Sequence, residues 1–222
     1  MRHYVCKVDN DSREWDNILD SDELKNIGQN ARRYSKRDLR NLLKEKKEIS
    51  LKQKFLSVLL IEQIKLNKWP MLKYAKEIIS LVYAKQKYLA ELSSLYGLRS
   101  IQVENQMMEW LTNIDMRIYA VETVYRKTGN LTSGVDNVKL TRKNMLLQLD
   151  YLKSSKLKRH IPSDLRYISI FKGSKNLKPL GISTIKDRVI QTLFVQVLEP
   201  VIDVHSDLYS FGYRKGRNAH LA

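Results

Sequence analysis

The chain has 222 residues, with 40 Lys and Arg side chains against 24 Asp and Glu, so its formal net charge is +16. Hydrophobic residues make up 43% and charged residues 29%, which is typical of a globular protein. The longest apolar stretches fall far short of the roughly 20 residues of a membrane span, and no signal-peptide region opens the chain. The lone Cys6 excludes an internal disulfide, and four dispersed His leave no structural zinc site. We therefore expect a soluble, intracellular, strongly basic protein with no membrane partner.

The positive charge is unevenly distributed. Residues 1–24 carry three basic and seven acidic side chains, whereas residues 139–188 carry 13 basic and only 3 acidic ones. A field of this sign attracts polyanions, so the second segment favours contact with nucleic-acid phosphates. Lys-rich helical stretches such as 44–54 fit a plain solvated surface equally well.

Helix-breaking residues divide the chain into a helical first part and a mixed second part. Before residue 128 there are two Gly and one Pro; after it come six Gly and three Pro. This predicts the α+β class, with an acidic, poorly ordered tail over 1–24 and a helical region of unassigned role over 25–100.

The apolar spacing predicts three long helices in the first part. The first spans 37–67, with Leu51, Phe55, Leu59 and Leu66 among its apolar positions. The second spans 71–96 and ends at Gly97. The third spans 101–125, where an unbroken apolar stripe at Met107, Leu111, Ile114, Ile118, Val121 and Tyr125 indicates a packing surface.

The second part begins with residues that are typical of turns. Gly134 and Asp136 are expected to set a turn, and a short basic helix follows over 141–154. Alternating residues 166–171 and the return stretch 177–182 predict a β-hairpin turning at 172–176. A last helix is expected from Thr184 to Pro200.

Four segments, in this order, resemble the amino-terminal portion of group II intron-type reverse transcriptases. They read Y-R-K-T-G-N-L-T-S-G-V-D-N (125–137), R-Y-I-S-I-F-K-G-S-K-N-L-K-P-L-G-I-S-T-I-K-D-R-V-I-Q (166–191), L-E-P (198–200) and S-F-G-Y-R-K-G-R-N-A-H (210–220). The resemblance covers about 95 of the 222 residues. It implies that 101–222 form the amino-terminal extension and fingers of a right-hand polymerase fold, without its palm.

The resemblance also implies site residues. Lys172 and Lys178, on the two hairpin strands, match positions that hold the phosphates of an incoming nucleotide. Lys178 stands where the family has Arg, and Phe171 and Ser183 stand where it usually has Pro. From charge and motif position together, the expected nucleic-acid contacts are Lys153, Lys156, Lys158, Arg159, Arg166, Arg188, Arg214 and Arg217.

No catalytic or metal-binding residue is expected in this chain. It contains no Tyr-x-Asp-Asp, and Asp203 and Asp207 precede the Gly-Tyr-Arg turn instead of following it. The family enzyme uses Mg²⁺ held by palm aspartates, so we expect this chain to bind structured intron RNA as part of a longer reading frame, without polymerising. A second polypeptide supplying palm and thumb would complete it.

Two alternatives remain open. The chain is either a freestanding basic RNA-binding protein that assists splicing, or the product of a decayed reading frame. Its richness in Lys, Ile, Asn and Leu fits an A+T-rich genome, so the expected location is a chloroplast or mitochondrion that encodes it, with bacterial cytoplasm as the alternative.

Overall fold

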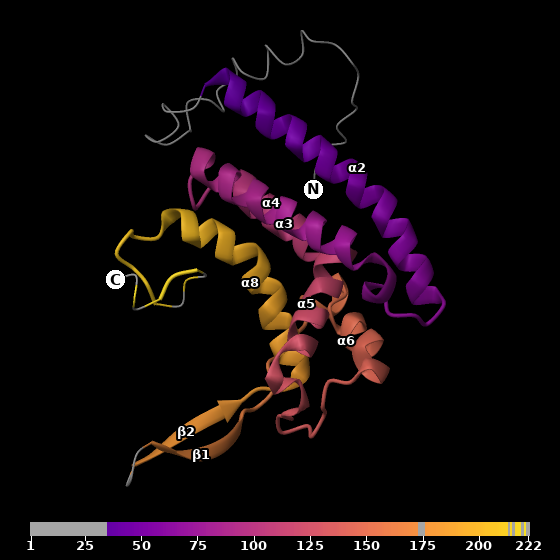
Figure 1. The fold of residues 1–222 in the computed structure, drawn as a ribbon, viewed down its shortest axis with the longest axis vertical. Coiled ribbons are helices and arrows are strands. Elements are labelled where there is room, and N and C mark those ends of the chain that lie inside the picture. Colours follow the sequence, from indigo (N-terminus) through magenta and orange to yellow (C-terminus); the bar gives the residue numbers. More distant parts are fainter. Residues whose placement is uncertain (1–34, 173–175, 213, 215, 219, 221–222) are drawn as a thin grey trace.

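The computed structural model describes residues 35–172, 176–212, 214, 216–218 and 220 (Figure 1). The predicted acidic tail and the hairpin turn at 173–175 lie outside the described residues. The elements in chain order are α2 (Lys36–Lys65), α3 (Met71–Tyr96), α4 (Ile101–Leu111), α5 (Ile114–Arg126), η3 (Thr128–Leu131), η4 (Arg142–Asn144), α6 (Met145–Tyr151), α7 (Ser154–Leu157), β1 (Arg166–Lys172), β2 (Asn176–Ile182) and α8 (Ile185–His205).

Helix α2 begins at a capping box. The Ser35 hydroxyl accepts from the Asp38 amide at 3.3 Å, and the Asp38 carboxylate accepts from the Ser35 amide at 2.8 Å. The helix packs on α3 through Leu42, Ile49, Leu56 and Leu60, which are all buried. The predicted apolar positions lie elsewhere: Leu51, Phe55 and Leu66 are exposed and Leu59 is half-buried. Burial follows the 42–49–56–60 stripe because that side of the helix faces α3.

Helix α3 is the centre of the helical body, in contact with α2, α4, α5 and α8. It ends as predicted at Gly97, whose φ of 89° suits glycine, and the Gly97 amide donates to the Ser93 carbonyl at 2.8 Å. A charged pair is buried beside it. Lys85 (0% exposed) donates to both carboxylate oxygens of Asp115 (1% exposed) at 3.0 and 2.8 Å.

The predicted single helix over 101–125 was wrong, because two helices, α4 and α5, occupy this stretch. Thr112 ends α4, and its hydroxyl donates to the Glu109 carbonyl at 2.6 Å. Asn113 then adopts an extended conformation (ψ 139°) as the N-cap of α5. The new helix start places Asp115 in the first turn of α5, opposite Lys85.

The predicted end of α8 at Pro200 was also wrong, since the helix continues to His205. A proline lacks the amide that would bond the carbonyl four residues earlier, which here belongs to Gln196. The side-chain nitrogen of Gln86, on α3, donates to that carbonyl at 3.0 Å. A tertiary contact therefore satisfies the group that Pro200 leaves without a helical partner.

The strands β1 and β2 form an antiparallel hairpin that projects from the helical body at the start of α8 (Figure 1). Its register pairs Arg166 with Ile182 and Ile170 with Lys178. The described fold is thus mainly helical with one small antiparallel sheet, which confirms the α+β class. None of the helices in the described part of the chain combines the length and apolar character of a membrane span.

Candidate nucleic-acid interface

The hairpin exposes large side chains on both of its faces. Tyr167 and Phe171 are 72% and 80% exposed, and the aliphatic residues Ile168, Ile170, Leu177 and Leu180 are 38–57% exposed. Lys178 is exposed on β2, and Lys172 is the last residue of β1, paired with Asn176. The two predicted phosphate-binding positions are therefore two residue pairs apart on the same ladder.

Asp187, in the first turn of α8, closes the base of the hairpin. Its Oδ2 accepts from the Thr184 hydroxyl at 2.7 Å and from the Ser163 amide at 3.1 Å, and its Oδ1 lies 2.8 Å from Nε2 of His160. His160 and Ser163 precede β1, whereas Thr184 and Asp187 follow β2. Burial raises the pKa of Asp187, but the hydrogen bonds and the nearby His160 outweigh it and hold that pKa below its usual value.

Arg188 anchors the turn at η3. Its guanidinium donates to the carbonyls of Ser183 at 3.1 Å, Gly129 at 2.7 Å and Thr132. Burial lowers the pKa of Arg188. Three backbone acceptors thus engage a side chain predicted to contact nucleic acid, so this arginine has a structural role here.

Gly134 packs directly on the start of α8. A Cβ at this position would lie 2.8 Å from the Cα and backbone nitrogen of Thr184. The predicted turn is confirmed, because the Asn137 amide donates to the Gly134 carbonyl at 3.3 Å and the Val138 amide donates to the Asp136 carboxylate at 3.1 Å. Arg166, at the start of β1, donates to the Ser133 hydroxyl at 3.4 Å.

A basic cluster lies at the end of α6 and around α7. We define it as Lys153, Lys156, Lys158, Arg159 and Lys186; the first four are exposed and Lys186 is half-buried. Lys153 and Lys156 both pair with Asp150, and these contacts hold the pKa of that carboxyl below its usual value. The single basic helix predicted over 141–154 was wrong, because η4, α6 and the start of α7 occupy that stretch.

Tyr151 joins the basic cluster to α8. The ammonium groups of Lys156 and Lys186 lie 5.4 and 5.2 Å from the centre of its ring. Lys186 was not among the predicted contacts. The position of Lys186 beside Asp187 in the I-K-D-R segment was the sequence signal that could have identified it as a contact residue. Its proximity to Tyr151 comes only from the fold.

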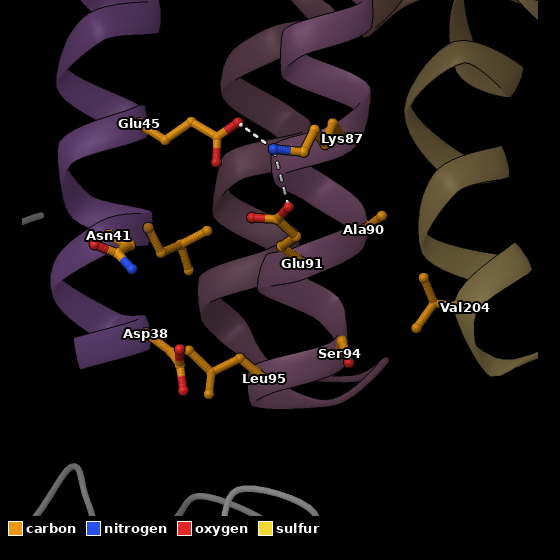
Figure 2. Close-up of a pocket in the computed structure, with 10 residues that line it drawn as sticks. Asp38, Asn41, Glu45, Lys87, Ala90, Glu91, Ser94, Leu95 and Val204 are labelled. Atoms are coloured by element: carbon orange, nitrogen blue, oxygen red, sulfur yellow. Dashed lines mark hydrogen bonds and ion pairs between the residues drawn. The ribbon is translucent and has the colours of Figure 1, made fainter. Parts of the chain in front are cut away.

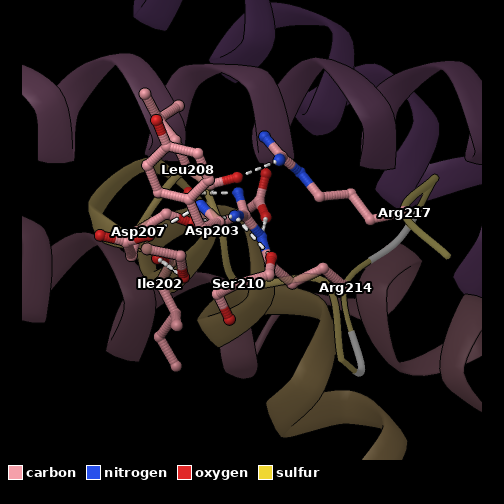
Figure 3. Close-up of polar contacts among 9 residues, drawn as sticks. Ile202, Asp203, Asp207, Leu208, Ser210, Arg214 and Arg217 are labelled. Atoms are coloured by element: carbon pink, nitrogen blue, oxygen red, sulfur yellow. Dashed lines mark hydrogen bonds and ion pairs between the residues drawn. The ribbon is translucent and has the colours of Figure 1, made fainter. Parts of the chain in front are cut away.

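Arg214 and Arg217 lie at the other end of α8 (Figure 3). Arg214 donates to the Asp203 carboxylate at 2.7 Å and to the carbonyls of Asp203, Asp207 and Ser210. Arg217 donates to the Leu208 carbonyl at 2.7 Å and stacks near Phe211, 5.5 Å from the ring centre. Arg214 therefore ties this segment to the last turn of α8, whereas Arg217 contacts residues of the segment itself.

The structure separates the predicted site residues into two regions. The hairpin, the Asp187 contacts and the basic cluster surround the start of α8, whereas Arg214 and Arg217 lie beyond its end. A helix of 21 residues is about 30 Å long, so the two regions do not form one surface patch. Among the described residues, no group of three or more His, Cys, Asp or Glu side chains is arranged to hold a metal ion.

A pocket of about 590 Å³ lies between α2, α3 and the end of α8 (Figure 2). Lys87 bridges Glu45 at 3.3 Å and Glu91 at 3.2 Å on its wall, and these carboxylates raise the pKa of Lys87. None of the predicted contact residues lines this pocket.

No protein-family model matches the chain. Two curated proteins are similar to part of it. Protein YkfC of Escherichia coli is 30% identical over 117 residues, covering 51% of this chain and 29% of that protein. A putative COX1/OXI3 intron 1 protein of Saccharomyces cerevisiae is 25% identical over 126 residues, covering 54% of this chain and 14% of that protein. The matched stretches thus span less than a third of either relative.

Proposed function

We propose that this chain acts as the amino-terminal part of a group II intron-type reverse transcriptase or maturase and binds structured intron RNA. Residues 101–222 would supply the amino-terminal extension and the fingers, whereas residues 25–100 have no assigned role. The similarity to a protein named for an intron supports this proposal, as do the motifs at 125–137, 166–191, 198–200 and 210–220. Only a small share of that relative is matched, so its activity as a whole is not assigned to this chain.

The projecting hairpin is the observation that carries the proposal. A two-stranded sheet alone is marginally stable in water, yet this one leaves aromatic and aliphatic side chains exposed on both faces. Its base is held to α8 by Asp187, which contacts residues on both sides of the hairpin. A rigid base with exposed Tyr167, Phe171 and Lys178 suits bases that stack and phosphates that pair with cations.

The basic cluster would contact the RNA backbone. Its exposed ammonium and guanidinium groups recognise phosphate without reading sequence, which fits a folded RNA recognised by shape. Arg188 and Arg214 would act mainly by holding the turns on which other contacts depend, since backbone carbonyls already occupy several of their donors.

RNA binding is tested by measuring the affinity of the chain for a folded intron RNA over a range of salt concentrations. Each phosphate contact contributes a slope of roughly −0.7 to −0.9 to log affinity against log salt. Replacing Lys153, Lys156, Lys158 and Arg159 together with Ala should make the slope shallower by about 3 and weaken binding to all RNA sequences alike.

A control variant removes the same number of charges elsewhere. Lys44, Lys46, Lys52 and Lys54 of α2 are exposed, and replacing them with Ala should change the slope by clearly less than the cluster variant does. Equal effects of the two variants would refute the assignment of the basic cluster, and a salt-independent affinity would refute phosphate contact altogether.

The polymerase part of the proposal concerns a complete enzyme. We propose that nucleotide phosphates contact Lys172 and Lys178, and that Mg²⁺ and catalytic aspartates come from palm residues outside this sequence, on the same or a second polypeptide. Primer extension with Mg²⁺ by residues 1–222 should therefore give no product above a protein-free control. The proposed location is the organelle that encodes the chain, with bacterial cytoplasm as the alternative.

A further inference from the structure

The hairpin separates its aromatic and its cationic side chains onto opposite faces. Side chains alternate between the two faces along each strand, and directly paired residues share a face. One face therefore consists of three pairs, Tyr167 with Gly181, Ser169 with Pro179, and Phe171 with Leu177. We call these six residues the aromatic face. None of them is charged, whereas Arg166 and Lys178 both belong to the opposite face.

The two rings of the aromatic face are open to solvent. Tyr167 is 72% and Phe171 80% exposed, because the hairpin projects away from the helical body (Figure 1). The Tyr167 ring lies over Gly181, where a Cβ would be 3.6 Å from Cε1 of the ring. The missing side chain thus lets this ring lie against β2. Phe171 stands where the resembling family usually has Pro, so its ring is not a general feature of that family.

A protein partner does not suit the aromatic face. A stable protein interface buries about 800 Å² on each side, contributed by about 20–30 residues. The aromatic face has only six positions, and Gly181 and Ser169 offer little apolar area among them. Pro179 has no amide to donate to an added strand, so β2 is also a poor edge for extending the sheet.

Unpaired bases match this face in chemistry and in spacing. Aromatic rings bind nucleic acid by stacking on bases, which needs no charge and is open only to bases released from their own stack. Tyr167 and Phe171 are four residues apart on one strand, which is about 14 Å. Stacked bases follow one another about every 3.4 Å, so a strand that stacks on both rings is extended between them. A duplex cannot extend in this way without losing base pairs.

We propose that the aromatic face stacks unpaired bases of the bound RNA and thereby favours single-stranded segments over duplex. The inference rests on the proposed RNA binding. The net charge of +16, exposed Lys178 and the basic cluster supply the attraction for the phosphates of that strand. Because the aromatic face itself is uncharged, loss of its rings should weaken binding without changing the dependence of affinity on salt.

Two matched double variants of the full chain test the assignment. Tyr167→Thr with Phe171→Thr removes both rings, whereas Ile168→Thr with Ile170→Thr removes apolar groups from the opposite face of the same strand. Threonine favours strands, so both variants keep the hairpin. Affinities are measured for a short single-stranded RNA and for its blunt duplex. Since one stacked base contributes about 5–150-fold, loss of both rings should weaken single-strand binding at least about 25-fold and duplex binding less than about threefold. The control variant should bind both RNAs as wild type does.

Fluorescence gives a readout that does not depend on affinity. Phe171→Trp places an indole on the aromatic face, and single-stranded RNA should quench it more than it quenches Ile170→Trp on the opposite face. Equal quenching, or an equal effect of ring removal on single strand and duplex, would overturn the stacking and leave RNA binding intact. If wild type binds neither RNA, the proposed function fails and the stacking with it. Self-association without RNA that is lost on ring removal would make the face a contact between copies and refute the inference.

Discussion

Gly134→Ala should destabilise the junction between the turn and α8. The added methyl group would lie 2.8 Å from two backbone atoms of Thr184 and 3.0 Å from the carbonyl carbon of Ser183. Carbon atoms pack best at about 3.5–4.0 Å, so the two backbone segments would have to separate by roughly 0.7 Å. Neither can rotate away as a side chain would, because Thr184 is also the N-cap of α8. Overpacking of this kind costs about 1–3 kcal/mol.

A matched substitution isolates the steric cost. Any Gly→Ala change also restricts the unfolded chain, which by itself stabilises the protein by about 0.4–1 kcal/mol. Gly212→Ala shares this contribution, because a Cβ at Gly212 meets no atom within 4 Å. The difference between the two variants should therefore be about 1–3 kcal/mol, or roughly 2–12 °C in melting temperature for a chain of this size.

Thermal unfolding followed by circular dichroism measures this difference directly. If Gly134→Ala and Gly212→Ala melt within about 1 °C of each other, the close approach of the turn to Thr184 is wrong. If the close approach is right, the proposed RNA binding should also be weaker in Gly134→Ala, because the same junction holds the base of the hairpin.

Three further predictions concern charged side chains. The folded pKa of Asp187 lies below its unfolded value, so the stability that its carboxylate contributes is present above about pH 4 and is lost as pH falls through the folded pKa. The difference in unfolding free energy between wild type and Asp187→Asn should therefore shrink on acid titration. Lys85→Met should cost about 3–5 kcal/mol in urea unfolding, because it leaves Asp115 buried without its partner, and adding Asp115→Leu should recover most of that loss. Arg214→Lys should increase tryptic cleavage after Arg217, since an ammonium group cannot reach the Asp203 carboxylate and three carbonyls at once; unchanged cleavage would contradict the structural role of Arg214.

Local signals were sufficient for the elements whose ends are set by neighbouring residues. Gly97 and Thr184 each determine a helix end through contacts within four residues, and both ends lie where the sequence predicts them. The first helix was predicted from residue 37; it begins at Lys36, where the capping box of Ser35 and Asp38 sets its start. The hairpin strands likewise follow from alternation between two turn segments. The roles of Lys172 and Lys178 stay predictions that rest on the resemblance.

The chain by itself determined its α+β class, its excess of positive charge and the order of its motifs, because composition and spacing are properties of the sequence alone. Tertiary contacts decided the rest. The helix continues through Pro200 because Gln86 bonds the carbonyl that proline leaves free, and Leu51 and Phe55 are exposed because α3 covers the other side of α2. Charge and motif position predict Arg188 and Arg214 as nucleic-acid contacts, yet both donate to backbone carbonyls, because the fold places those carbonyls within hydrogen-bonding distance.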